Sequence, residues 1–115
     1  MHVLLINGSP HEKGCTYTAL SLVAGELNAA GITTEILNVG TKPVGGCIGC
    51  GGCAKGNGCV FGGVVNEAIE KARTADAFVF GTPVHYASAS GNMTSFLDRL
   101  AYAGGKYLAY KPAAI

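Results

Sequence analysis

Four cysteines lie close together in the middle of this chain, and their sulfurs are the side-chain atoms best suited to metal chemistry. They follow the spacing C-x2-C-x2-C-x5-C and are Cys47, Cys50, Cys53 and Cys59. Thiolates are strong ligands for iron and zinc. Glycines at positions 49, 51, 52, 56 and 58 permit tight turns around the sulfurs. The pattern predicts a loop that can bring four thiolates around one centre.

Three interpretations of this loop stay open. A 4Fe-4S cluster held by the four thiolates fits the spacing. A tetrahedral zinc site would use the same ligands, but its usual pattern is two separated C-x-x-C pairs, so zinc ranks below the cluster. The third interpretation is a loop that keeps its thiols without a metal. The fifth cysteine, Cys15, is distant in sequence and is not counted as a ligand.

A second candidate site lies near the amino terminus, where the apolar run at residues 2–6 turns into a short loop. This loop and the residues after it include Gly8, Ser9, Pro10, Gly14 and Thr16. These residue types let a backbone turn sharply and direct amides and hydroxyls at one point. A helix expected to begin near Thr16 adds unpaired amides and the positive end of its dipole. The stretch therefore predicts a phosphate site.

Strands and helices alternate along the chain and would position both sites. We expect buried strands over 2–6 and 76–81 and a partly alternating strand over 33–39, with Ile36 and Thr34 facing inward. The first helix ends at Gly31 and carries the apolar stripe Leu20, Val23, Leu27 and Ala30. A second helix covers 64–75 with its stripe at Val65, Ala68, Ile69 and Ala72. A third begins near Asn92 or Gly91, after a loop over 82–91, and its stripe is Met93, Phe96, Leu97 and Leu100.

This order predicts an α/β protein with a doubly wound parallel sheet in three layers, α/β/α. The sequence stops at Ala113 to Ile115, where a fourth strand would start, whereas such sheets normally have about five strands. We therefore expect residues 1–115 to form one domain that is truncated after the start of the fourth strand and lacks roughly its last third.

Composition narrows the classes of protein that fit. Hydrophobic residues make up 49% and charged residues 13%, with a net charge of +1. The high hydrophobic content and low charged content are typical of a packed domain. The net charge of +1 argues against a basic surface for nucleic-acid binding. There is no apolar run of membrane-spanning length and no signal-peptide pattern, so we expect a cytoplasmic protein with reduced thiols.

Five motifs in order make the chain similar to one known family. They are Asn7-Gly8-Ser9-Pro10 with Gly14-Cys15-Thr16, Cys47 to Cys53, Gly58-Cys59-Val60, Gly81-Thr82-Pro83-Val84-His85-Tyr86, and Phe96-Leu97-Asp98-Arg99-Leu100. The chain resembles the flavodoxin-like NAD(P)H-dependent FMN reductases, including their iron-sulfur flavoprotein branch. The resemblance covers the whole chain and implies a flavodoxin-like fold.

The resemblance also implies which residues bind FMN. Its phosphate would lie in the first loop, against Ser9, Pro10, His11, Gly14, Cys15 and Thr16. Its ring would lie along the second loop, against Thr82, Pro83, Val84, His85 and Tyr86. No side chain is nominated as catalytic, because the cofactor carries the chemistry. Asp98 and Arg99 are expected to be ordinary surface charges.

The implied activity is that of an FMN-dependent NAD(P)H oxidoreductase, which passes a hydride from a nicotinamide to FMN and on to an acceptor. The alternative is an iron-sulfur flavoprotein that carries electrons through a cluster on Cys47, Cys50, Cys53 and Cys59. Either function implies a small-molecule or protein electron acceptor as partner, neither nucleic acid nor membrane, and a homo-oligomer when the chain is full length.

Overall fold

A parallel sheet forms the centre of the computed structural model, which describes residues 1–115. Its strands lie in the order β2-β1-β3-β6, where β1 is His2–Asn7, β2 is Thr33–Asn38, β3 is Ala77–Gly81 and β6 is Ala113–Ala114. All three pairings are parallel, as the predicted alternation of strands and helices requires. The predicted α/β architecture is confirmed.

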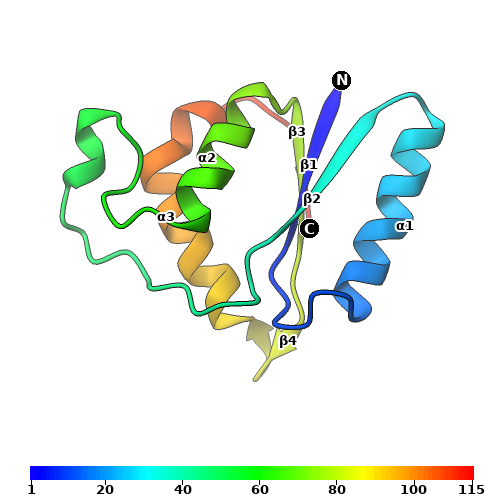
Figure 1. Ribbon diagram of the computed structural model, residues 1–115, viewed down its shortest axis with the longest axis horizontal. Helices are drawn as coiled ribbons and strands as arrows, with labels where there is room; N and C mark the ends of the chain where they lie inside the picture. The colour runs from blue at the N-terminus through cyan, green and yellow to red at the C-terminus, as the bar shows by residue number, and fades with distance from the viewer.

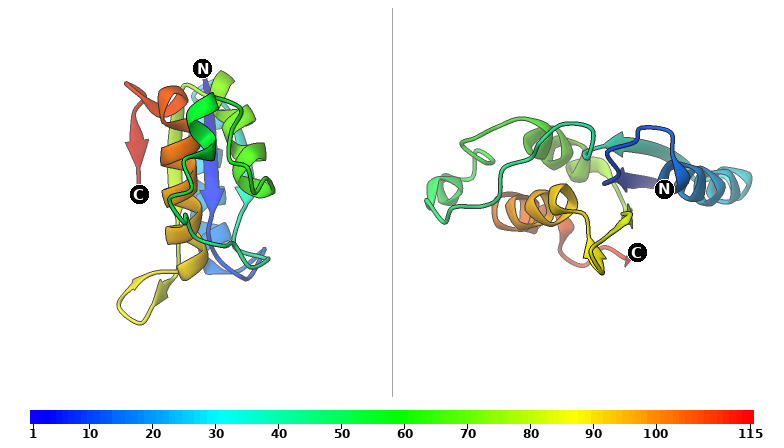
Figure 2. Two further views of the ribbon diagram at one scale, coloured as in Figure 1. Left: turned by 90° about the vertical axis from the view of Figure 1, so that its left-hand side faces the viewer. Right: turned by 90° about the horizontal axis from the view of Figure 1, so that it is seen from below.

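Three helices cover the two faces of the sheet (Figure 1). α1 (Cys15–Ala29) lies on one face, and α2 (Val64–Thr74) and α3 (Gly91–Leu108) lie together on the other. Figure 2 shows the same layers from two further directions. None of these helices combines the length and apolar composition needed to cross a bilayer.

The larger core lies between the sheet and the pair α2 and α3. The four residues predicted to form the stripe of α2 are all buried, as are Met93, Phe96 and Leu100 of α3. Leu4 and Ile6 of β1 meet these helices, while Val3 and Leu5 face α1 on the other side. Strand β1 is buried on both faces, which explains its unbroken run of apolar residues.

The smaller core lies under α1, and here one predicted stripe is partly wrong. Leu20 and Ala24 are buried and Leu27 is half-buried, whereas Val23 is 40% exposed and Ala30 is also exposed. Leu20, Ala24 and Leu27 follow one another at steps of four and three and form a narrow stripe that faces the sheet. Val23 lies beside this stripe. Gly31 ends the helix in the left-handed conformation (φ 83°), as predicted.

Two features of the loop over 82–91 differ from the prediction. The cap of α3 is Ser90, not Asn92 or Gly91, because the Ser90 hydroxyl accepts a hydrogen bond from the Met93 amide at 3.2 Å. The segment before the cap is a small antiparallel hairpin of β4 (Val84–His85) and β5 (Ser88–Ala89) rather than an irregular loop.

The long cysteine loop contains a single turn of 3-10 helix, η1 (Gly52–Lys55).

Candidate functional site

The candidate phosphate loop leaves β1 at its carboxyl end, next to the end of β3. Asn7 lies between Asn38 and Gly81 in the sheet, and the Gly8 amide donates to the Gly81 carbonyl at 2.8 Å. In the strand order β2-β1-β3, β2 lies on one side of β1 and the next strand, β3, lies on the other, so the order of the strands switches between β1 and β3. Parallel sheets bind ligands in the crevice outside the strand ends at such a point. The first loop therefore lies where this fold binds its ligands.

Buried polar groups fix the shape of that loop. The Asn7 side chain is fully buried; its oxygen accepts from the Ser9 amide at 3.1 Å, and its nitrogen donates to Asn38 Oδ1 at 2.9 Å. Ser9 is also buried, and its Oγ accepts from the His11 amide at 3.1 Å. Because the Ser9 hydroxyl acts there as an acceptor, its own proton remains available to an anionic ligand.

Helix α1 begins directly after this loop, with Gly14 as its N-cap and no side chain bonded to its first amides. The first amide bonded within this turn is that of Thr18, which donates to the Gly14 carbonyl at 3.0 Å. The amides of Cys15, Thr16 and Tyr17 have no acceptor in the protein. Cys15 is exposed and Thr16 half-buried at this helix end. Open amides beside a hydroxyl donor are a donor set that fits a phosphate group.

Ser90 joins the second loop to the first. Its hydroxyl donates to the Gly8 carbonyl at 2.9 Å, and its amide donates to Thr82 Oγ1 at 3.0 Å. A side chain that is 2% exposed thus holds the end of β1, the end of β3 and the start of α3 together. This arrangement fixes the relative position of the two predicted cofactor loops.

Five of the residues predicted to bind the cofactor line two hollows at this end of the sheet. One of about 270 Å³ is lined by Pro10, His85 and Ser90 among others. The other, of about 560 Å³, is lined by Cys15, Thr16 and Thr82 together with apolar residues of α1, β3 and the C-terminal residues. The structure thus brings Pro10 and His85 to one hollow, and Thr16 and Thr82 to the other.

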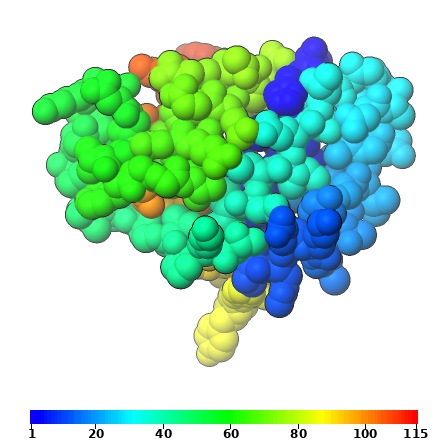
Figure 3. All heavy atoms as spheres, in the orientation of Figure 1, coloured from blue at the N-terminus to red at the C-terminus, as the bar shows by residue number.

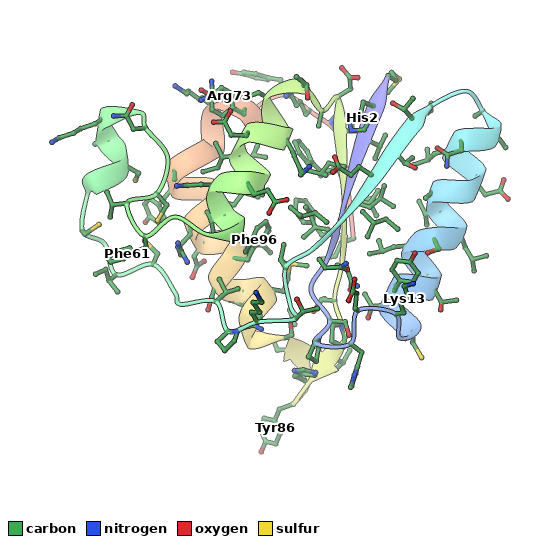
Figure 4. The ribbon with its side chains drawn as sticks, viewed as in Figure 1. His2, Lys13, Phe61, Arg73, Tyr86 and Phe96 are labelled. Atoms are coloured by element: carbon green, nitrogen blue, oxygen red, sulfur yellow. The ribbon has the colours of Figure 1, made fainter.

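The hairpin carries two of the other predicted residues, Val84 and Tyr86, away from both hollows. Val84 is 77% exposed and Tyr86 is fully exposed. Figure 3 shows the hairpin, in yellow, standing out below the body of the molecule, and in Figure 4 the labelled Tyr86 points outward at its tip. Tyr86 (φ 49°) and Ala87 (φ 64°) both adopt the left-handed conformation that such two-residue turns require.

The four central cysteines line one pocket. It measures about 140 Å³ and lies between the cysteine loop and α3, with Ile48, Val60 and Phe61 as its main apolar residues. All four thiols are free. No three of them are gathered as ligands of one metal ion. The pocket matches a thiolate-bound centre in the type and number of its donors. A tetrahedral zinc site would need its four sulfurs about 3.8 Å apart, for zinc–sulfur bonds of about 2.3 Å, and the cysteines are not gathered in that way.

Cys59 is the cysteine most firmly held. Asn66 of α2 bonds both backbone groups of Cys59 at 2.8 Å, accepting from its amide and donating to its carbonyl. Arg99 Nε donates to Cys59 Sγ at 3.4 Å. Burial raises the pKa of the Cys59 thiol, but the amides of Phe61 and Gly62 and the Arg99 guanidinium outweigh burial and lower its pKa below the ordinary value.

The expectation that Arg99 is an ordinary surface charge is wrong. Asp98 is exposed, but Arg99 is 8% exposed and lies under the cysteine loop. Besides Cys59, its guanidinium donates to the carbonyls of Gly45 at 3.2 Å and Gly62 at 2.9 Å. Adjacent helix positions point about 100° apart, so one residue of the pair faces solvent and the other faces the loop.

Asn92 is a further residue that sequence reasoning missed as a site residue. Its side-chain nitrogen donates to the carbonyls of Gly40 and Lys42 at 3.0 Å each, and its oxygen accepts from the Val44 amide at 3.1 Å. Ser90, Asn92 and Arg99 thus hold both sites from one helix. Their partners are mainly backbone groups distant in sequence, and such partners leave no pattern in the chain.

Comparison with known proteins identifies the family. The family model described as NADPH-dependent FMN reductase matches residues 1–115. The chain belongs to this family. The predicted membership is therefore confirmed over the whole chain.

The family's curated relatives are also similar in sequence. An iron-sulfur flavoprotein of Archaeoglobus fulgidus is 33% identical over 99 residues, which are 86% of this chain and 48% of the relative. An iron-sulfur flavoprotein of Methanocaldococcus jannaschii is 30% identical over 99 residues, which are 86% of this chain and 51% of the relative. The chain spans about half the length of these relatives.

Two solved structures share the fold of this chain. An NADH:FMN oxidoreductase in its apo form has a TM-score of 0.68 at 21% identity, covering 98% of this chain and 57% of its own. An NAD(P)H:quinone oxidoreductase from Methanothermobacter marburgensis has a TM-score of 0.69 at 21% identity, covering 90% of this chain and 54% of its own. At this identity the comparison supports the fold, and the flavodoxin-like prediction is confirmed.

Proposed function

We propose that this member of the FMN reductase family is part of an FMN-dependent oxidoreductase. The observation that carries the proposal is the loop between β1 and α1, which contains a buried serine hydroxyl, Ser9, and leads into the open amides of Cys15, Thr16 and Tyr17. A phosphate group needs this kind of donor set, and FMN brings one. The loop lies at the strand ends where the sheet order reverses.

In this proposal the first loop holds the phosphate and the second loop contacts the flavin ring. Ser9, Thr16 and the backbone of Gly14 and Cys15 bind the phosphate, with Pro10 and His11 at its rim. Thr82, Pro83 and Val84 give the ring a polar edge and an apolar surface, and His85 and Tyr86 extend that surface along the hairpin. When bound, FMN supplies hydride transfer from a nicotinamide and delivery of electrons to a small-molecule or protein acceptor. The protein binds, orients and shields it.

A comparison of FMN with riboflavin tests the phosphate site. Flavin fluorescence or absorbance titration should give an FMN affinity at least tenfold above that for riboflavin, which lacks the phosphate. Thr16→Ala should reduce this preference, whereas Thr74→Ala, at the end of α2, should leave it unchanged. Equal affinities for FMN and riboflavin in the unmodified protein would contradict the assignment of the first loop.

The second candidate function is electron transfer through an iron-sulfur cluster held by the four central cysteines. The specific observation in its favour is that all four cysteines line one pocket. Relatives of which this chain spans about half carry the name iron-sulfur flavoprotein. Cys47, Cys50, Cys53 and Cys59 would be the ligands, and the cluster would add one-electron transfer to the flavin chemistry.

A visible spectrum with iron and sulfide analysis decides between the two functions. A flavin spectrum without iron, together with sustained NAD(P)H oxidation in the presence of an artificial acceptor, supports the reductase alone. Four iron and four sulfide per chain, lost in Cys50→Ser but not in Cys15→Ser, support the cluster. Cys15 is the matched control because it lies outside the central pocket.

A further inference from the structure

Arg99 is a buried cation without a carboxylate partner. It is 8% exposed, and its three hydrogen bonds go to one sulfur and two backbone carbonyls. The two ion pairs of the structure join Lys71 to Glu35 and Arg73 to Glu70. A buried guanidinium is costly unless an anion compensates it, and the carbonyls supply only partial negative charge. The surroundings of Arg99 therefore call for a further anionic group.

The pocket beside Arg99 offers one place for that anion. Arg99 lines it together with the four cysteines, and most of its other lining residues are apolar. No carboxylate lies among them. A metal centre held by four thiolates carries a net negative charge, and an apolar pocket strengthens its attraction to a nearby cation. The charge of Arg99 thus matches the ligand that the four sulfurs would hold.

Arg99 also connects the two ends of the cysteine loop. Gly45 comes two residues before Cys47, and Gly62 comes three residues after Cys59. One guanidinium bonds both of these glycines while its third donor reaches Cys59. The loop between them has only η1 as regular structure. The side chain therefore sets the separation of the first and last ligands from a rigid helix.

We propose that Arg99 is the charge partner and positioning residue of the metal centre held by Cys47, Cys50, Cys53 and Cys59. This inference rests on the proposed cluster and assigns to Arg99 a role in its stability and its reduction potential. A cation that donates a hydrogen bond to a ligating sulfur stabilises the more negatively charged, reduced state of a cluster. Arg99 should therefore raise the reduction potential.

The test compares Arg99→Gln and Arg99→Lys with the unmodified protein and with Arg73→Gln. Arg73 is the matched control because it is the other arginine of the chain and lies exposed on α2, paired with Glu70. Each protein is reconstituted anaerobically with iron and sulfide. Iron per chain, the reduction potential of the cluster and the far-ultraviolet circular dichroism are then measured.

We expect Arg99→Gln either to lose at least half of its iron or to shift the one-electron equilibrium at least tenfold toward the oxidised state, which is about 59 mV. Arg99→Lys keeps the charge but not the planar guanidinium group. Its iron content and reduction potential should therefore lie between those of Arg99→Gln and those of the unmodified protein. Arg73→Gln should match the unmodified protein. If Arg99→Gln does not fold, Arg99→Lys decides by the same two measurements.

Three results would overturn the inference. Unchanged iron and potential in the Arg99 variants would show that the cluster does not depend on this cation. Loss of iron together with loss of the dichroism signal in both variants would show a role in folding alone. Absence of iron and sulfide from the unmodified protein would remove the cluster itself, and this result is distinct because it appears before any variant is compared.

Discussion

The Ser90 hydroxyl donates a hydrogen bond of 2.9 Å to the Gly8 carbonyl oxygen, and the two residues are 82 positions apart in the chain. The oxygen of the Ser90 hydroxyl also caps α3, because it accepts a hydrogen bond from the Met93 amide. A single buried side chain thus links the candidate phosphate loop to the helix that also carries Asn92 and Arg99. Both candidate sites depend on the position of α3.

Removal of this hydroxyl should weaken both the fold and the first loop. Ser90→Ala deletes the cap of α3 and leaves the buried Gly8 carbonyl without its donor, so we expect the free energy of unfolding to fall by about 1–3 kcal/mol. Urea denaturation measures the loss. The half-buried Ser95 of the same helix provides the control, and Ser95→Ala should change stability by a few tenths of a kcal/mol. An equal effect of the two substitutions would contradict the role given to Ser90.

Close contact between the first loop and the start of the cysteine loop gives a second prediction. A Cβ atom on Gly40 would lie 2.3 Å from the Gly8 carbonyl oxygen, whereas one on Gly45 would have no atom within 4 Å. Gly40→Ala should therefore displace backbone and lower the free energy of unfolding by about 2 kcal/mol or more, with a weaker affinity for FMN. Gly45→Ala should be close to neutral. Thermal denaturation and flavin titration of the two variants provide the comparison.

Local sequence patterns predicted the framework of this fold because its elements are strongly periodic. The apolar residues of α2 recur at steps of three and four, which predicts a helix with one buried face. The unbroken apolar run of β1 predicts a strand that is buried on both faces of a parallel sheet. The positions of the two candidate cofactor loops followed from that framework, since loops after parallel strands meet at one edge of the sheet. The narrower stripe of α1 was predicted less well because only one side of this helix meets the sheet.

The contacts that hold the sites together were beyond local patterns. Arg99 bonds Gly45, Cys59 and Gly62, which lie 37 to 54 positions away. Two of these partners are carbonyl oxygens, which every residue has. The hairpin escaped prediction for a related reason: its turn is formed by Tyr86 and Ala87, whereas turns of this geometry are recognised by Asn and Gly.

Reactivity of Cys59 in the metal-free protein gives a third prediction. Because its pKa is lowered, the reactive thiolate of Cys59 should persist to lower pH than that of an ordinary thiol. The rate of alkylation by iodoacetamide, followed by peptide mass spectrometry, should therefore reach half of its maximum at a lower pH than in a model thiol peptide. Arg99→Gln removes a donor and a positive charge, so it should move this midpoint upward. A midpoint that does not respond to Arg99→Gln would assign the lowered pKa to the amides of Phe61 and Gly62 alone.

The turn of the projecting hairpin gives the fourth prediction. Ala87 adopts φ 64°, a conformation that costs a residue with a Cβ atom about 1 kcal/mol relative to glycine. Ala87→Gly relieves this strain but adds conformational freedom to the unfolded chain, so we expect it to be neutral or stabilising by up to about 1 kcal/mol. Ala89→Gly, two residues later in β5 where φ is not positive, brings only the entropic cost and should be destabilising by about 0.5–1 kcal/mol. Chemical denaturation of the two variants measures the difference in sign. If Ala87→Gly destabilises as much as Ala89→Gly, the left-handed turn that presents Tyr86 is not the conformation that the protein adopts in solution.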